Sequence, residues 1–142
     1  MAGETTSVSV ATSRAFYDNP GAGAFFVPFS LTYSTVQNEL NDVMEAGYIP
    51  ANTRVVAVYW GPTDMDSSTA AVHKVTVGST DVVTGLTGAQ TGTASWNAVT
   101  STAVATAVSS SPALVKVTTT TAAGTAVAGT ATLMLLCQKA TA

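Results

Sequence analysis

Residues 48–60 read Tyr48-Ile49-Pro50-Ala51-Asn52-Thr53-Arg54-Val55-Val56-Ala57-Val58-Tyr59-Trp60, the longest dense run of β-forming residues in the chain. Valine and aromatic side chains favour the pleated, half-buried surface of a strand. Strict alternation places Val55, Ala57 and Tyr59 on one face and Val56, Val58 and Trp60 on the other, so both faces are apolar. A strand of this kind is covered on both sides, either inside a sandwich or by a neighbouring subunit.

The segment before this strand predicts a second long strand over Ala24–Gln37. Phe29, Leu31 and Tyr33 share one face of it, with serine and threonine opposite. Pro28 cannot donate a hydrogen bond to a sheet, so we expect an edge strand or a bulge at that position.

Residues 36–48 allow two interpretations. Val36, Leu40, Val43 and Met44 form an apolar stripe at helical spacing. Asn41-Asp42 is a turn signal, however, and residues 43–48 can equally run as a strand into Ile49-Pro50. Periodicity alone slightly favours the helix.

The second half of the chain contributes shorter predicted strands separated by turns or glycine-rich loops. These strands cover residues 72–78, 94–99, 114–121 and 130–138. The last is apolar on both parities, which predicts a central strand. About eight strands with turns every 8 to 15 residues are typical of an all-β fold, an antiparallel β-sandwich or jelly roll.

Residues 1–19 are mostly small and polar, and we interpret them as an extended N-terminal arm with at most a short edge strand over Ser7–Ala11. Asp18-Asn19-Pro20-Gly21 is a strong turn that separates this arm from a single sandwich domain over residues 20–142. Arg14, Phe16 and Tyr17 interrupt the arm. Such residues either dock back on the sandwich or anchor onto a partner.

Only 9% of the residues are charged, against a usual share of about 25%, and the net charge is −3. The five basic residues are scattered, so no nucleic-acid partner is expected. No apolar run approaches the roughly 20 residues of a membrane-spanning helix. A surface so poor in charge is either a plain Thr/Ser-covered one or one that is occupied by copies of the chain or by a partner.

The residues that could carry chemistry do not assemble into a recognisable site. His73 is the one histidine, and Cys137 lies in an apolar run that predicts a small buried hydrophobe. Asp64 and Asp66 could hold a cation with Asp81, but two carboxylates on a loop are usually solvated. We therefore expect no catalytic residues, no metal site and no cofactor.

Three segments resemble small virion proteins of tailed bacteriophages: residues 41–55 with their Ile-Pro-Ala turn, Lys74-Val75-Thr76-Val77-Gly78, and the closing residues 128–136. The similarity covers roughly Ala24 to Cys137. It implies a β-sandwich head-decoration, or cement-like, protein, and it favours a strand over Val43–Tyr48.

The resemblance and the composition together predict a structural virion protein on the capsid exterior, made in the host cytoplasm. Its expected partners are the major capsid protein and further copies of itself, with a trimer favoured. Arg14, Phe16 and Tyr17 would contact the capsid, and Tyr59, Trp60 and Trp96 would pack in the core or between subunits. The alternatives are a tail or minor capsid protein, and a carbohydrate-binding or adhesin module in which the same three rings form an exposed stacking platform.

Overall fold

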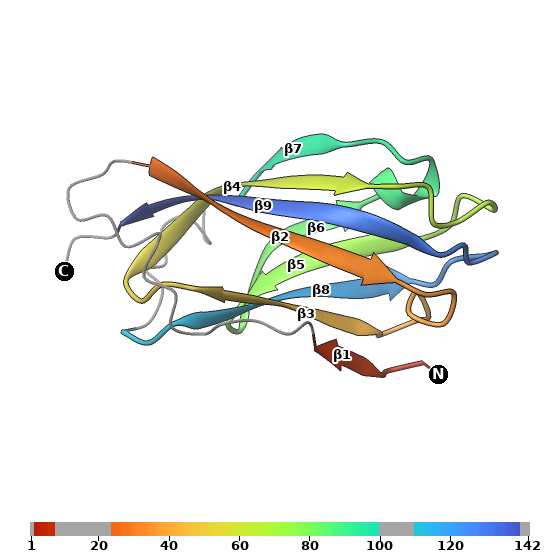
Figure 1. Cartoon of the computed structure of the whole chain (residues 1–142), viewed down its shortest axis with the longest axis horizontal. Coiled ribbons are helices and arrows are strands. Elements are labelled where there is room, and N and C mark those ends of the chain that lie inside the picture. Colours follow the sequence, from red (N-terminus) through yellow and green to blue (C-terminus); the bar gives the residue numbers. More distant parts are fainter. Residues whose placement is uncertain (1, 8–23, 100–109, 140–142) are drawn as a thin grey trace.

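The computed structural model describes residues 2–7, 24–99 and 110–139, and the regular secondary structure in these ranges is almost entirely strand (Figure 1). Besides one short 3-10 turn, η2 (Gly88–Gln90), the elements are strands. They are β1 (Thr5–Ser7), β2 (Ala24–Tyr33), β3 (Val43–Ile49), β4 (Thr53–Pro62), β5 (Val72–Val77), β6 (Thr80–Leu86), β7 (Ser95–Ala98), β8 (Ala113–Thr121) and β9 (Gly129–Lys139).

These strands form two sheets that face each other, which confirms the predicted all-β sandwich. Sheet A has the order β1-β3-β8-β5-β6, and sheet B has the order β2-β9-β4-β7. All pairs are antiparallel except β1 with β3, which is parallel. The inward side chains of both sheets make one core, with Leu31, Trp60 and Leu135 from sheet B against Met44, Val75 and Val115 from sheet A.

Successive strands mostly lie in different sheets, so neighbours in space are distant in sequence. Among the described strands only β5 and β6 pair directly in succession. They are joined by Gly78-Ser79, and Gly78 has φ 61°, the left-handed conformation that a two-residue hairpin loop with glycine first requires. The other paired strands are far apart in the sequence, so a long loop must close before each pair can form.

The two long strands of sheet B agree with their predicted places. β2 is an edge strand, which leaves the missing N–H of Pro28 without consequence for the ladder. Its Val27, Leu31 and Tyr33 are buried, and the alternate residues face outward. β9 lies between β2 and β4, as its two apolar faces predicted.

The strand at residues 53–62 departs from strict alternation, so the face predicted for Val55 is wrong, while Ala57 and Tyr59 do lie opposite Val58 and Trp60. The register of β4 against β9 shifts between Val55 and Ala57, because Val56 is bulged. Val55, Val58 and Trp60 therefore point inward together, while Ala57 and Tyr59 point outward and are half-buried. A bulge of this kind moves every following side chain to the other face.

Two further segments differ in how well the sequence predicted them. Residues 43–49 form the strand β3, not a helix, and Asn41 in the preceding turn has φ 67°. Strand β6 is not among the predicted strands, because the sequence between the predicted strands at 72–78 and 94–99 indicates only turns and a glycine-rich loop. Two register shifts in the β5–β6 pair break the alternation that would have revealed it.

The described start of the chain lies against the body. β1 pairs with β3 at the edge of sheet A, and the N–H of Glu4 donates to Asp42 Oδ1 at 3.1 Å. Gln37 Nε2 also donates to Thr6 Oγ1 at 2.9 Å. Of the short edge strand expected over Ser7–Ala11, Ser7 closes β1 and the other residues fall outside the described ranges.

Candidate functional site

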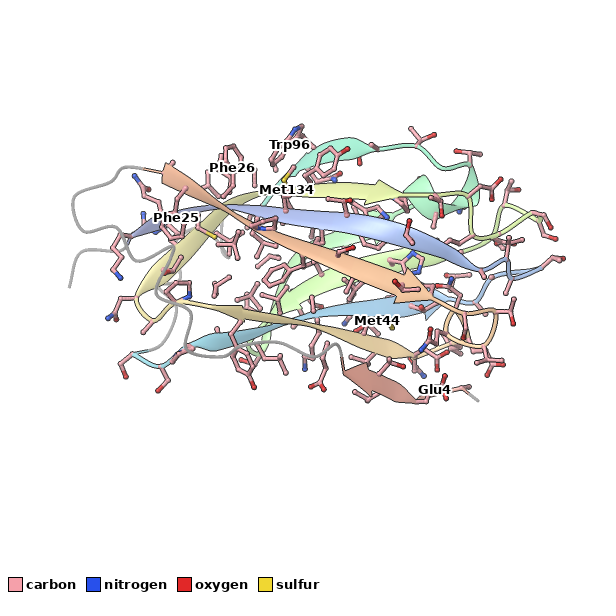
Figure 2. All side chains as sticks on the ribbon, viewed as in Figure 1. Glu4, Phe25, Phe26, Met44, Trp96 and Met134 are labelled. Atoms are coloured by element: carbon pink, nitrogen blue, oxygen red, sulfur yellow. The ribbon has the colours of Figure 1, made fainter. Side chains whose placement is uncertain are left out.

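The outward face of sheet B carries apolar side chains from all four of its strands. We call it the sheet-B face and define it by one set of outward residues: Phe26, Pro28, Ala57, Tyr59, Trp96, Ala98, Met134 and Leu136. Cross-strand register places them side by side, since Met134 is opposite both Pro28 and Tyr59, and Tyr59 is opposite Trp96. Figure 2 shows Phe26, Met134 and Trp96 gathered in the same region of the molecule.

The aromatic rings of this face contact one another although they come from three strands. The ring centroids of Tyr59 and Trp96 are 5.3 Å apart, and those of Phe26 and Trp96 are 5.9 Å apart. Gly61 leaves room for the Tyr59 ring, because a Cβ there would stand 2.6 Å from Tyr59 Cε1. Phe26 and Trp96 nevertheless remain 51% exposed. Solvent therefore reaches rings that the sheet already holds in place.

Charge is almost absent from the sheet-B face and its surroundings. Ser30, Thr32, Thr130, Thr132 and Gln138 continue the outward rows of β2 and β9 and form an uncharged polar rim. Arg54, at one end of β4, is the one charged residue among the described outward positions of the four strands.

The outward face of sheet A carries several charged side chains. Lys74 Nζ lies 3.1 Å from Asp81 Oδ2, and Glu45 stands opposite Lys116 in the register of β3 and β8. A solvated antiparallel sheet normally alternates apolar inward and polar outward residues. Sheet A mixes these charged residues with the outward apolar residues Val43, Tyr48 and Leu114, whereas the outer face of sheet B is almost free of charge.

Asp66 is the most heavily bonded side chain in the loops at one end of the sandwich. Its carboxylate accepts from the N–H groups of Ser68, Ala70 and Ala71 in its own loop, and from those of Gly124 and Thr125 in the β8–β9 connection, at 2.7–3.1 Å. Burial alone would raise the pKa of Asp66, but the backbone N–H donors outweigh it and hold that pKa below its ordinary value. This aspartate joins two loops; the expectation that it is solvated is wrong.

His73 lies in the core near the same end, with Tyr33 and Trp60 beside it at centroid distances of 6.0 and 5.4 Å. Its Nε2 lies 2.7 Å from Asn38 Oδ1, which fixes the proton on Nε2 because an amide oxygen only accepts. Burial lowers the pKa of His73 to about 4. The imidazole is therefore a neutral core group at physiological pH.

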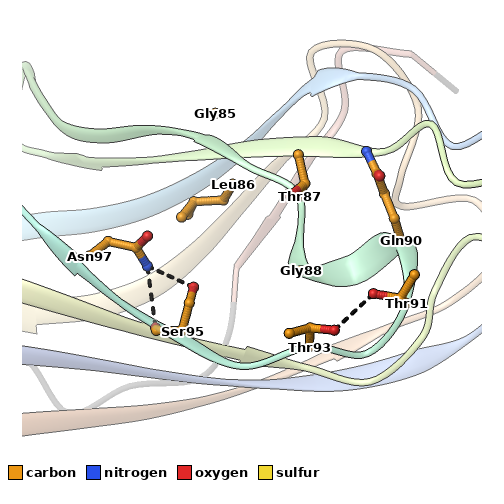
Figure 3. A pocket seen from close by; sticks show the side chains of 9 residues that line it. All are labelled: Gly85, Leu86, Thr87, Gly88, Gln90, Thr91, Thr93, Ser95 and Asn97. Atoms are coloured by element: carbon orange, nitrogen blue, oxygen red, sulfur yellow. Dashed lines mark hydrogen bonds between the residues drawn. The ribbon is translucent and has the colours of Figure 1, made fainter.

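A shallow pocket of about 280 Å³ lies between β6, η2 and β7 (Figure 3). It is lined by neutral side chains, and several already bond within the chain. Asn97 Nδ2 donates to Ser95 Oγ at 3.0 Å, the hydroxyls of Thr91 and Thr93 are 2.8 Å apart, and Gln90 Nε2 donates to Ala71 O. No lining residue is a general acid, a general base or an activated nucleophile.

The predicted site residues divide into three groups. Arg14, Phe16 and Tyr17 fall outside the described residues. Trp60 is fully buried in the core, while Tyr59 and Trp96 lie on the sheet-B face, so the three rings do not form one exposed platform. Phe26 and Met134 of this face were not singled out from the sequence, because only pairing across β2, β9, β4 and β7 brings them beside Trp96.

Cys137 is completely buried, as its apolar run predicted. Within the three described ranges, no group of three or more His, Cys, Asp or Glu side chains is arranged to hold a metal ion. The same ranges contain no helix with the length and apolarity needed to cross a membrane.

No protein-family profile and no curated protein sequence matches this chain. Solved structures do match it. A chain from the capsid of Ralstonia phage GP4 superposes with a TM-score of 0.76 and 18% identity, covering 97% of this chain and 99% of the other. A chain from the capsid asymmetric unit of cyanophage Pam1 superposes with a TM-score of 0.65 and 18% identity, covering 92% and 96%. At this identity the likeness shows a shared fold.

Proposed function

We propose that this chain is a structural virion protein, a decoration or cement protein that binds the outside of a tailed-phage head and stabilises it. The observation that carries the proposal is the nearly end-to-end match of its fold to chains from two phage capsids. The proposed partner is the major capsid protein. We also propose that the chain is a homo-oligomer, with a trimer favoured.

The physical character of the molecule supports a role in adhesion. The described residues form a stiff two-layer body, and one of its outer faces is apolar and nearly uncharged. A protein that covers a lattice needs only modest affinity at each contact, because many simultaneous contacts multiply the total effect. The pocket beside β7 offers no acid or base for catalysis, which is consistent with a binding role.

We propose that Arg14, Phe16 and Tyr17 make the contact with the shell. Removing residues 1–19 would be a poor test, because it would also remove β1 and its bonds to Asp42 and Gln37. Alanine at the three positions keeps β1 intact. A matched control is the triple alanine variant of Val36, Leu40 and Val127, which are exposed apolar side chains in loops.

The experiment mixes purified protein with phage shells assembled without it and measures the bound fraction by co-sedimentation. We expect wild type and the control triple variant to bind and to protect shells against heating, and the Arg14/Phe16/Tyr17 variant to lose binding. Normal binding by that variant would refute the role of the arm. Failure of wild type to bind any shell would refute the decoration role itself.

Electron microscopy of virions carrying an epitope-tagged copy separates the remaining virion alternatives. Antibody on the head surface supports decoration. Antibody on the tail, or on one vertex alone, would assign the chain to the tail or to a minor capsid position.

A further inference from the structure

We infer that the sheet-B face is a contact surface between copies of this chain. Its centre is the apolar set around Phe26, Tyr59, Trp96 and Met134, and its rim is the uncharged polar set on β2 and β9. An apolar, aromatic centre with a polar rim is the usual anatomy of a protein interface. This inference concerns association in solution and does not depend on binding to a shell.

The exposure of the two central rings is the first argument. Phe26 and Trp96 are each 51% exposed, although neighbouring rings fix their positions. Aromatic side chains that are held in place lose little conformational entropy when a partner covers them. They are also the residue types that most often dominate binding energy.

Charge decides which partner fits. The sheet-B face has only Arg54 at one end, so neither an acidic nor a basic partner finds a complementary surface there. The chain carries a net charge of −3, and the sheet-B face holds almost none of its charged groups. Other copies of the chain present the same uncharged aromatic surface, so this is the face through which copies approach with the least repulsion.

The size of the face follows from the lengths of its strands. β2 and β9 have 10 and 11 residues. With a rise of about 3.3 Å per residue and strands about 4.8 Å apart, the three long strands and the four-residue β7 outline roughly 400 Å². Side chains that stand out from the sheet raise the accessible area above this outline. The outline is smaller than the roughly 800 Å² per partner of a standard interface, and these side chains reduce the difference.

The contact also accounts for a feature of β4. Its outward residues Ala57 and Tyr59 are apolar, yet the other sheet covers only the inward side of the strand. Copies that meet through the sheet-B face would cover this second apolar side.

The test compares the oligomeric state of wild type, Phe26→Lys, Trp96→Lys and the control Val36→Lys by sedimentation velocity over a wide concentration range. Val36 is a suitable control because it is also 51% exposed and lies in the β2–β3 connection. We expect wild type and Val36→Lys to associate alike. Each of the other two variants should raise the dissociation constant roughly 30-fold or more, which corresponds to a hot-spot residue of about 2 kcal/mol.

Fluorescence gives a second readout on folded protein. Trp60 is fully buried and Trp96 is half exposed. In the Trp60→Phe variant, the emission of Trp96 should shift to the blue and become protected from acrylamide as concentration rises. The Trp96→Phe variant, which retains Trp60, should show no concentration dependence, and it remains informative if Trp60→Phe fails to fold.

Two results would overturn the inference. One is a wild type that stays monomeric at every concentration, and the other is equal association by Trp96→Lys and Val36→Lys. If wild type is monomeric alone and Trp96→Lys loses only shell binding, the occupant of the face is the shell, and the proposed function stands while the self-contact falls. If wild type associates with itself but binds no shell, the self-contact stands and the proposed decoration role falls.

Discussion

At the scale of single residues, two buried polar side chains hold one end of the sandwich together by different means. Asp66 remains a charged acceptor because five backbone N–H groups replace water around its carboxylate. His73 lies between the rings of Tyr33 and Trp60 and is held as a neutral donor to Asn38. Each residue makes stability depend on pH, and for both the dependence has the same sign.

Replacing Asp66 by asparagine should destabilise the protein by about 3 kcal/mol, because the amide N–H₂ group would face backbone donors and leave buried N–H groups without an acceptor. Chemical denaturation at neutral pH measures this loss. Asp64→Asn is the matched control, since Asp64 is exposed and accepts the N–H of Asp66 through an oxygen that asparagine retains. Equal stability of the two variants would contradict the role assigned to Asp66.

Acidification should weaken the fold through His73. The pKa of this group is about 4 in the folded state and about 6.5 in the unfolded chain, so the unfolded state binds the additional proton first. Stability from His73 is complete above pH of about 6.5 and falls by about 3 kcal/mol as the pH approaches 4. The buried Nδ1 that would take the proton has no hydrogen-bond partner in the described protein.

Unfolding free energies measured from neutral pH down to this range test the effect. His73→Gln keeps a donor for Asn38 but does not titrate, so its stability should change less over the same range. The pKa of Asp66 is also lowered, so its contribution declines only when the pH falls below the ordinary carboxylate range. An identical pH profile for wild type and His73→Gln would exclude His73 as the source.

At the scale of strands, the sequence predicted the elements that follow regular alternation and missed those that do not. β2 and β9 alternate without interruption, and their faces and places were predictable. In β4 a single bulged residue, Val56, places Val55 on the inward face with Val58 and Trp60 and not with Ala57 and Tyr59. β6 was missed because its pairing with β5 has two irregularities.

The candidate site was less predictable than the fold for a related reason. Tyr59 and Trp96 stand out in the sequence as large rings, but their exposure depends on strand order, which local patterns do not encode. Phe26 and Trp96 are 70 positions apart in the numbering and meet only because β9 and β4 lie between their strands. Asp66 looked like a loop carboxylate, since its donors at Gly124 and Thr125 come from a different connection.

The attachment of β1 gives a prediction at this scale. Asp42 accepts the N–H of Glu4 at Oδ1 and that of Glu39 at Oδ2, so it connects β1 to the turn before β3. Asp42→Ala should increase hydrogen exchange at residues 4–7 by at least tenfold and leave β9 protected, because β9 lies in the centre of the other sheet. Uniform loss of protection across both sheets would mean that Asp42 supports the whole body and not β1 alone.

At the scale of the whole molecule, the outer faces of the two sheets differ in polarity. Sheet A presents Lys74, Asp81, Lys116 and Glu45, whereas the sheet-B face presents aromatic rings and methionine. The sheet-B face therefore has fewer charged groups and more exposed aromatic rings than the face of sheet A, which suits it to contact with another protein surface.

Salt should therefore leave association through the sheet-B face unchanged or strengthen it slightly. Screening weakens ionic contacts, but it does not weaken apolar burial, and sulfate favours burial further. Sedimentation velocity in low and high sodium chloride, and then in sodium sulfate, measures the effect. Dissociation by sodium chloride would point to a contact made by the charged face of sheet A.

The interior position of Cys137 has a practical consequence for locating this protein in an assembly. It is the one cysteine of the chain, no solvent reaches it, and burial raises the pKa of its thiol to about 12. Maleimides react with the thiolate, so the native fold should not be labelled. A single cysteine engineered at Val127 would then be the sole reactive handle, and a gold cluster or dye attached there would report orientation without a background signal.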